Sequence, residues 1–190
     1  MVLGIPRGAV PMARVIADML GGDLDVVLVH KLSHPDELEL AIGAIDDSGN
    51  AILTDYAAHV DPEYLESEKQ RQLEALRQRR ARYTPLRPPL DPQGRIVIVV
   101  DDGVATGSTM IAALRAVRAR IPKELIAAVA VTSPEAARAI ARECDVAVYL
   151  KVPSKFHAVG QFFADFSQVE EEEVISALQH GQARPRSAAG

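Results

Sequence analysis

Two adjacent carboxylates, Asp101 and Asp102, directly follow five apolar residues at positions 96–100. An apolar run of this length predicts a buried strand, and the two acids would stand at its carboxyl end. In open α/β sheets this is the edge at which ligands bind. Paired carboxylates at such an edge can bind the two neighbouring hydroxyl groups of a sugar.

The next segment, residues 103–109 with the sequence GVATGST, is suited to an anion. It leads into a predicted helix at residues 108–120, whose first N–H groups and dipole favour negative charge. Gly107 lets the backbone approach a ligand closely, and Thr106, Ser108 and Thr109 add hydroxyl donors. A phosphate monoester fits this loop, so acids and loop together describe a site for a ribose 5-phosphate group.

Two common phosphate loops do not match this segment. A Walker loop needs Lys before its Ser or Thr, whereas Ser108 follows Gly107 directly. The glycine spacing also differs from the dinucleotide-binding fingerprint. A surface turn with accidental acids is the alternative, and the continuous strand, loop and helix pattern counts against it.

The composition limits the class of protein. A chain of 190 residues that is 48% hydrophobic can bury one core, so we expect a single domain over residues 1–190. The formal net charge of −5 gives no general attraction to nucleic acid, so an anionic ligand needs a local positive site. Cys144 is the only cysteine, which favours a reducing, cytoplasmic location. No apolar run is long enough to predict a membrane span.

Short runs rich in Val and Ile alternate with Ala-rich helical patterns. This predicts an α/β fold with a doubly wound, mainly parallel five-stranded sheet and helices on both faces. The predicted strands cover residues 2–5, 24–29, 95–100, 125–131 and 145–150, and the predicted helices cover residues 8–20, 108–120 and 134–144. The first strand begins almost at the first residue, which raises the expectation of a truncated N-terminus.

Residues 32–94 break this rhythm and are interpreted as an insertion. Residues 38–45 and 51–54 flank the turn sequence DDSGN as a hairpin would. Residues 61–83 predict a charged helix, with Asp61 as N-cap and Pro62 at its first position. A cluster of arginines near its end predicts a solvated surface helix, with a nucleic-acid contact as the alternative; the cluster is Arg77, Arg79, Arg80 and Arg82. A Pro-rich connector follows at residues 85–92.

The segment IVIVVDDGVATGSTM closely resembles the phosphoribosyl-diphosphate motif of the class I phosphoribosyltransferases. The resemblance implies that Asp101 and Asp102 hold the ribose hydroxyls, directly or through Mg²⁺. It implies that the 5′-phosphate binds to Ala105, Thr106, Gly107, Ser108 and Thr109. The donor would be 5-phosphoribosyl-1-diphosphate.

Two basic residues are candidates for holding the leaving diphosphate. Arg7 lies in the sequence GIPRGAV, which resembles the family's diphosphate loop, so Pro6, Arg7 and Gly8 are expected to bind there, near a strained or cis peptide bond. Lys31 follows the predicted strand at residues 24–29, where relatives also carry a basic residue. His30 beside it is interpreted equally well as a partly buried structural histidine.

The acceptor is less well defined. In 6-oxopurine members of the family an acid stands where this chain has Ala105, which weakens the hypoxanthine or guanine reading. All four phenylalanines fall within residues 156–166, in a predicted C-terminal hood at residues 152–168. These rings would either stack on a planar base or dock into the core; the candidate acceptor residues are Phe156, His157, Phe162, Phe163 and Asp165.

Residues 37–45, with the sequence ELELAIGAI, would form either a mobile flap in which Glu39 acts or simply a buried hairpin strand. The whole chain resembles a group of bacterial phosphoribosyltransferases that share GIPRG, ELAIGA and DFSQV.

The resulting hypothesis is a Mg²⁺-dependent phosphoribosyltransferase that uses a nitrogen-heterocycle acceptor, with no nucleic-acid or membrane partner; because relatives are often dimers, a homodimer stays open. A donor-binding regulator without transferase activity, and a hydrolytic or phosphotransfer enzyme, are the alternatives.

Overall fold

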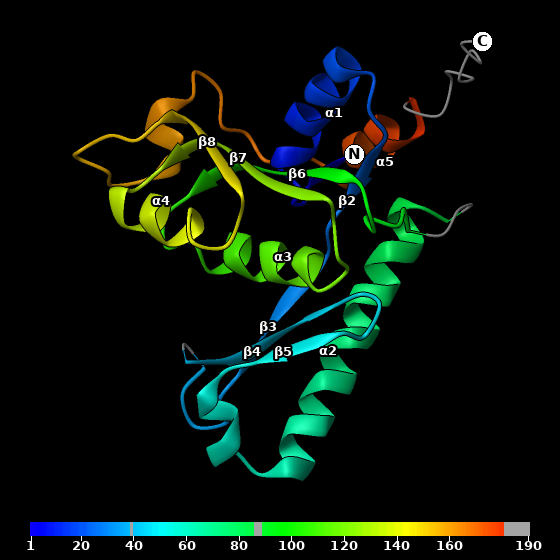
Figure 1. Ribbon diagram of the computed structural model, residues 1–190, viewed down its shortest axis with the longest axis vertical. Helices are drawn as coiled ribbons and strands as arrows, with labels where there is room; N and C mark the ends of the chain where they lie inside the picture. Colours follow the sequence, from blue (N-terminus) through cyan, green and yellow to red (C-terminus); the bar gives the residue numbers. More distant parts are fainter. Residues whose placement is uncertain (39, 86–88, 181–190) are drawn as a thin grey trace.

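The computed structural model describes residues 1–38, 40–85 and 89–180. Its core is a five-stranded sheet in the order β2-β1-β6-β7-β8, in which every neighbouring pair is parallel (Figure 1). The strands are β1 Val2–Gly4, β2 Leu24–Val26, β6 Ile96–Val104, β7 Glu124–Thr132 and β8 Val146–Lys151. This confirms the predicted doubly wound α/β class. The strand order reverses between β1 and β6, so the ligand-binding crevice of such a sheet is expected at the ends of these two strands.

Helices cover both faces of this sheet. On one face lie α1 Ala9–Leu20 and α5 Glu171–His180, and on the other lie α3 Ser108–Arg118 and α4 Pro134–Ile140 (Figure 1). Both α3 and α4 are shorter than predicted. Ile121 with a φ of 54° follows α3, and the chain after Ile140 forms turns. The helix α5 has no counterpart among the predicted elements; it buries Val174 and Leu178 against the core.

Small residues bring α1 close to β1. Ala9, Ala13 and Ala17 are wholly buried, one turn apart along the helix. A Cβ atom on Gly4 would lie 3.1 Å from the Cβ of Ala13. The close approach fixes the start of α1, and therefore the loop between β1 and α1, at the carboxyl edge of the sheet.

The insertion forms a separate antiparallel sheet in the order β3-β4-β5. Its strands are β3 Val29–Ser33, β4 Ala41–Asp46 and β5 Ala51–Leu53, followed by the 3₁₀ helix η1 Asp55–His59 and by α2 Pro62–Tyr83. The turn between β4 and β5 is held by Asp46, whose Oδ1 accepts hydrogen bonds from the backbone N–H groups of Ser48 (3.0 Å) and Asn50 (2.8 Å). The predicted hairpin is confirmed, and so is the helix with Asp61 as its N-cap.

The predicted strand at residues 24–29 is wrong as a single element. The chain leaves the parallel sheet after Val26, and Val29 already begins the small sheet. Val27 and Leu28 between them are buried, so an apolar run continues through the change of sheet. Lys31 consequently lies within β3, paired with Ala44, and not at the end of a core strand.

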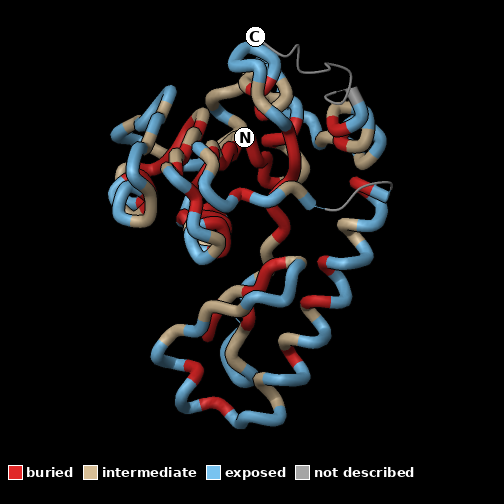
Figure 2. The backbone as a smooth tube through the Cα atoms, turned by 45° about the vertical axis from the view of Figure 1, so that its right-hand side comes forward, coloured by how far each residue is buried: buried red, intermediate tan, exposed pale blue. Residues whose placement is uncertain are grey.

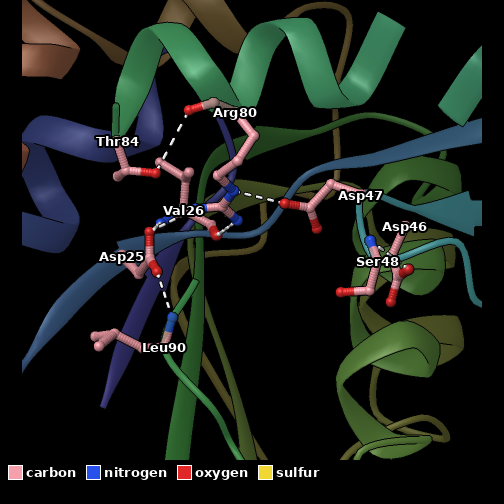
Figure 3. Close-up of polar contacts among 8 residues, drawn as sticks. All are labelled: Asp25, Val26, Asp46, Asp47, Ser48, Arg80, Thr84 and Leu90. Atoms are coloured by element: carbon pink, nitrogen blue, oxygen red, sulfur yellow. Dashed lines mark hydrogen bonds and ion pairs between the residues drawn. The ribbon is translucent and has the colours of Figure 1, made fainter. Parts of the chain in front are cut away.

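Arg80 ties α2 to the parallel sheet (Figure 3). Its Nη1 donates to Oδ1 of Asp25 (2.7 Å), its Nε to Oδ2 of Asp47 (2.5 Å) and its Nη2 to the carbonyl oxygen of Val26 (2.9 Å). Asp25 also accepts a hydrogen bond from the backbone N–H of Leu90 (2.9 Å). The guanidinium of Arg80 therefore joins α2, β2 and the hairpin turn, and Asp25 extends this network to the connector.

The helix α3 lies between the two sheets and contacts β3, β4 and β5 as well as β6 and β7 (Figure 1). Buried segments concentrate in the half of the molecule that contains the parallel sheet, whereas the insertion is largely exposed or intermediate (Figure 2). In the described ranges, none of the helices combines the length and the apolar character needed to cross a membrane.

Candidate functional site

The two acids of the central motif lie within β6, which extends to Val104 and not only to the predicted residue 100. Asp102 is half-buried and lines a cavity of about 370 Å³. Asp101 is only 8% exposed and does not line that cavity. The two carboxyl groups, equivalent in the sequence, therefore have different environments.

The environment of Asp101 disfavours its charged form. Burial, then the hydrogen bond with Asp102 and the negative charge of that neighbour, raise the pKa of Asp101 to about 8. Asp102 accepts a hydrogen bond from the backbone N–H of Gly103 (3.1 Å). Asp102 is the member of the pair that faces the cavity.

The loop after β6 presents its polar groups outward. Thr106, Ser108 and Thr109 are exposed, while Gly107 is buried with a φ of 92° as the N-cap of α3. The hydroxyl of Ser133 donates to the carbonyl oxygen of Ala105 (2.9 Å) and holds the loop against the start of α4. The first turn of α3 contains no acidic residue. Its free N–H groups and hydroxyls can therefore receive an anion.

The loop after β1 lies directly against Asp102. The Pro6–Arg7 peptide bond is cis, in agreement with the expectation for this loop. A Cβ atom on Gly8 would fall 2.0 Å from Oδ2 of Asp102, so only glycine fits there without a shift. Arg7, Gly8 and Asp102 line the same cavity. Arg7 and Gly8, predicted to bind diphosphate, are thus brought together with Asp102, predicted to bind ribose, where the strand order reverses.

Lys31 lines a second cavity, of about 280 Å³, between the small sheet, α2 and the start of α3. Pro6, Ser108 and Thr109 line it as well, so the cavity that contains Lys31 is also lined by both predicted phosphate loops. His30 beside it has Nδ1 2.8 Å from Oε1 of Gln72 in α2. This contact supports the structural reading of His30.

The C-terminal hood packs over the end of β6. It contains the 3₁₀ helix η2 Val159–Phe162, and a Cβ atom on Gly103 would fall 2.0 Å from Cγ1 of Val159. The four phenylalanines form two ring pairs: Phe156 with Phe162 (6.1 Å between centroids) and Phe163 with Phe166 (5.0 Å). None of the four rings belongs to either buried cluster of the described residues, which disfavours docking into the core.

The predicted acceptor residues separate into two groups. Phe163 and Asp165 line the 370 Å³ cavity together with Arg7 and Asp102. Phe156, His157 and Phe162 do not line it, and His157 is exposed. The hydrogen bonds from Ser167, first of all that from its backbone N–H (2.9 Å), hold the pKa of Asp165 below its usual range. The cavity therefore contains an ionised carboxylate beside an aromatic pair.

Several residues lining the two cavities were not singled out by the sequence as site residues. The larger cavity also contains Met12, Phe166, Ser167, Gln168 and Val169, and the smaller one contains Arg79 of α2. Residues 166–169 belong to the sequence DFSQV, which the chain shares with the bacterial group that it resembles, and this shared sequence was the signal that could have identified them. Arg79 was visible only as one member of a charge run.

The flap interpretation of residues 37–45 receives less support than the hairpin interpretation. Ile42 and Ile45 are buried within the small sheet, and Leu40 is partly buried before β4 begins. Glu39, the residue expected to act in a flap, lies outside the described residues.

Comparison with known proteins agrees with this arrangement. Residues 1–165 match the model of the phosphoribosyl transferase domain. A Mycobacterium tuberculosis protein named "Putative phosphoribosyl transferase Rv0571c" is 37% identical over 180 residues, which are 93% of this chain and 41% of that protein. The crystal structure of TT1426 from Thermus thermophilus is 44% identical, with a TM-score of 0.87 over 94% of this chain and 86% of that one.

The chain spans about two fifths of the length of the curated relatives that it matches. The match to the domain model nevertheless includes both predicted phosphate loops, the paired acids and most of the hood. This chain therefore belongs to the phosphoribosyl transferase domain family.

Proposed function

We propose that this protein transfers a 5-phosphoribosyl group from 5-phosphoribosyl-1-diphosphate to a nitrogen heterocycle and releases diphosphate. The observation that carries the proposal is the shared cavity of Arg7, Gly8 and Asp102, next to the exposed hydroxyls of the α3 loop. A cation, a carboxylate and an anion-binding helix start are the groups that a phosphorylated sugar diphosphate requires.

Each part of the donor has a partner in this proposal. Asp102 accepts hydrogen bonds from the ribose hydroxyls, and Asp101, whose pKa is raised by burial, supports that side chain through their hydrogen bond. Residues 105–109 bind the 5′-phosphate. Arg7 and Lys31 bind the diphosphate, where a guanidinium can donate two parallel hydrogen bonds to phosphate oxygens.

The donor set is compatible with Mg²⁺. In the described part of the chain, no group of three or more His, Cys, Asp or Glu residues is arranged to hold a metal ion. Mg²⁺ usually takes one or two carboxylates and completes its shell with phosphate oxygens and water. Asp102, with Asp101 beside it, would hold the ion, which would neutralise negative charge on the diphosphate.

The residues of the chain support a dissociative transfer. The bond between C1 of the ribose and the diphosphate oxygen breaks, and its electron pair leaves with the diphosphate, where Arg7 and Lys31 stabilise the added charge. The ribose becomes cation-like, next to the carboxylate of Asp102. The lone pair of an acceptor nitrogen then forms the new bond to C1, and the nitrogen releases its proton to water, since Ala105 supplies no base.

The acceptor is proposed to occupy the 370 Å³ cavity under the hood. Phe163 and Phe166 provide aromatic surface for a planar base, and Asp165 can accept a hydrogen bond from an N–H group on its edge. These residues line the same cavity as Arg7 and Asp102, so base and donor would share one cavity. Positioning the two reactants in this way is itself a large part of catalysis.

The nucleic-acid alternative for the arginine cluster has little support. Arg80 is locked between two acids, and Arg82 lies 3.5 Å from Glu171. Arg79 lines a cavity, which leaves Arg77 as an exposed member of the four. Arg87, in the Pro-rich connector that follows this helix, lies outside the described residues.

The test is a diphosphate-release assay with the donor, Mg²⁺ and a panel of purines, pyrimidines and related heterocycles. We expect release that depends on one class of base, and none from the variant that combines Asp101→Ala with Asp102→Ala. Unchanged Mg²⁺-dependent donor binding by this double variant would contradict the donor site. Tight donor binding without release across the panel would instead identify a regulator, and release without any base would identify a hydrolase.

A further inference from the structure

One side of the 280 Å³ cavity beside the donor site contains no residue that the proposed function assigns to the donor. This wall is the last part of the insertion helix α2, represented by Leu76 and Arg79. The opposite walls are Lys31 of β3 and the start of α3 with Ser108 and Thr109. The cavity therefore lies between two elements already assigned to phosphate groups and a helix that has no assigned ligand.

The electrostatic character of this cavity favours an anion. Its lining contains the cations Lys31 and Arg79 and the N-terminal turn of α3, and no carboxylate is among its described residues. The neighbouring 370 Å³ cavity, in contrast, contains Asp102 and Asp165. In a chain with a net charge of −5, a cavity whose described lining contains two cations and no acid is a local positive site of the kind that a phosphate ligand needs.

Tyr83 holds the guanidinium of Arg79 in place and occupies only one of its hydrogen-bond donor atoms. Its Nε donates to the hydroxyl of Tyr83 (3.1 Å), and its Cζ lies 5.5 Å from the centroid of the same ring. Tyr83 is only 1% exposed, so the support is rigid. Within the described residues, neither Nη atom of Arg79 has a hydrogen-bond acceptor, and these two donors remain for a ligand.

The next residue, Arg80, fixes the backbone on which Arg79 stands. Its contacts with Asp25, Asp47 and Val26 attach the end of α2 to the parallel sheet (Figure 3). Nearer the middle of the helix, α2 contacts β3 through the side chains of Gln72 and His30 (2.8 Å). Arg79 is thereby positioned relative to both β3 and the carboxyl edge of the core sheet, and a pre-positioned donor loses little entropy when it binds.

We propose that Arg79 is a further donor-binding residue, contributed by the insertion, which binds the diphosphate group together with Arg7 and Lys31. The inference rests on the proposed function. The diphosphate is the preferred group because Pro6, from the predicted diphosphate loop, and Lys31 line the cavity. The 5′-phosphate, by comparison, is already assigned to residues 105–109 at the start of α3. Tyr83 is then a positioning residue that orients the guanidinium through its hydroxyl.

The experiment measures binding of the donor, of inorganic diphosphate and of ribose 5-phosphate to the full chain in the presence of Mg²⁺. We expect Arg79→Ala to weaken donor and diphosphate binding by about tenfold to a hundredfold, the range for one lost charge-assisted hydrogen bond. Ribose 5-phosphate binding should change by less than about twofold. Arg77→Ala removes the same charge from an exposed position on the same helix and should leave all three affinities unchanged.

Two further variants separate binding from folding. Arg79→Lys keeps the charge but not the planar fork, so it should recover part of the diphosphate affinity. Tyr83→Phe keeps the ring and removes the hydroxyl, and it should weaken diphosphate binding less than Arg79→Ala does. Thermal unfolding monitors whether each variant is folded. If wild-type protein binds diphosphate and folded Arg79→Ala binds it equally well, the inference is overturned. Failure of wild-type protein to bind the donor at all would instead overturn the proposed function.

Discussion

Gly8 and Asp102 are in direct contact across the two loops that flank the reversal of strand order. A Cβ atom on Gly8 would lie 2.0 Å from Oδ2 of Asp102. Gly8 itself has a φ of −56° and a ψ of −36°, which any residue can adopt. Contact with the acid, and not backbone freedom, is therefore the reason that glycine is needed here.

Gly8→Ala should consequently displace either the carboxylate of Asp102 or the loop that carries Arg7. We expect donor binding to weaken at least about tenfold, with a loss of stability of about 1–3 kcal/mol from the forced shift. Titration of the donor and urea denaturation measure the two effects. Gly22→Ala is the matched control, because the nearest atoms to its Cβ would be 3.8 Å away. Equal donor affinity in the two variants would argue against the contact.

Arg80→Ala should destabilise the protein strongly. Asp25 and Asp47 lie at 1% and 9% side-chain exposure, and the loss of Arg80 would remove a guanidinium that contacts both of these poorly solvated carboxylates. Removing one partner of a buried ion pair costs roughly 3–5 kcal/mol. Arg82→Ala breaks only the exposed 3.5 Å pair with Glu171 and should cost about 1 kcal/mol or less. Urea denaturation of both variants tests the difference, and similar losses would contradict it.

Much of this arrangement follows from local sequence. An apolar run, two acids and a Gly-Ser-Thr turn determine by short-range rules that a strand, a loop and the start of α3 follow one another here, although β6 itself extends to Val104 and not only to residue 100. The turn at Asp46 and the N-cap at Asp61 are equally local, because the side chain binds the N–H groups of residues two to four positions ahead. Such features were predictable with their correct residues.

Features that depend on distant partners were not predictable. Arg79 and Arg80 are adjacent and chemically identical, yet one lines a cavity and the other binds Asp25, 55 residues away. Periodicity also cannot reveal that the apolar run around Val27 passes from one sheet to another, since both sheets bury it. The hood rings pair with one another outside the core, which a count of aromatic residues does not distinguish from burial.

The raised pKa of Asp101 predicts a pH dependence of stability. The folded pKa is about 8 because of burial and then of Asp102, whereas an unfolded Asp titrates near about 3.9. Between these values the folded state binds more protons than the unfolded state, so the free energy of unfolding falls as the pH rises. Asp101→Asn stays neutral, so it should remove this slope and stabilise the metal-free protein at pH 8 by on the order of a few kcal/mol.

Urea denaturation from about pH 5 to about pH 9, without Mg²⁺ or donor, measures this effect. Asp145→Asn is the control. The hydrogen bond from Arg118 holds the pKa of Asp145 below its usual range, so this group stays ionised throughout the interval and its loss should not change the slope. An unchanged slope in Asp101→Asn would show that Asp101 is ionised in the folded protein.

The hood gives a matched pair of aromatic substitutions. Phe163 lines the cavity that contains Arg7 and Asp102, whereas Phe156 pairs with Phe162 away from it. If the acceptor base stacks there, Phe163→Ala removes stacking worth about 1–3 kcal/mol and should raise the KM for the base by about fivefold to a hundredfold. Phe156→Ala removes a ring of the same size and should leave this KM nearly unchanged. In both variants the KM for the donor should stay constant, because none of its proposed contacts lies in the hood. An equal rise in the acceptor KM for both variants would assign the rings to the packing of the hood and not to the base.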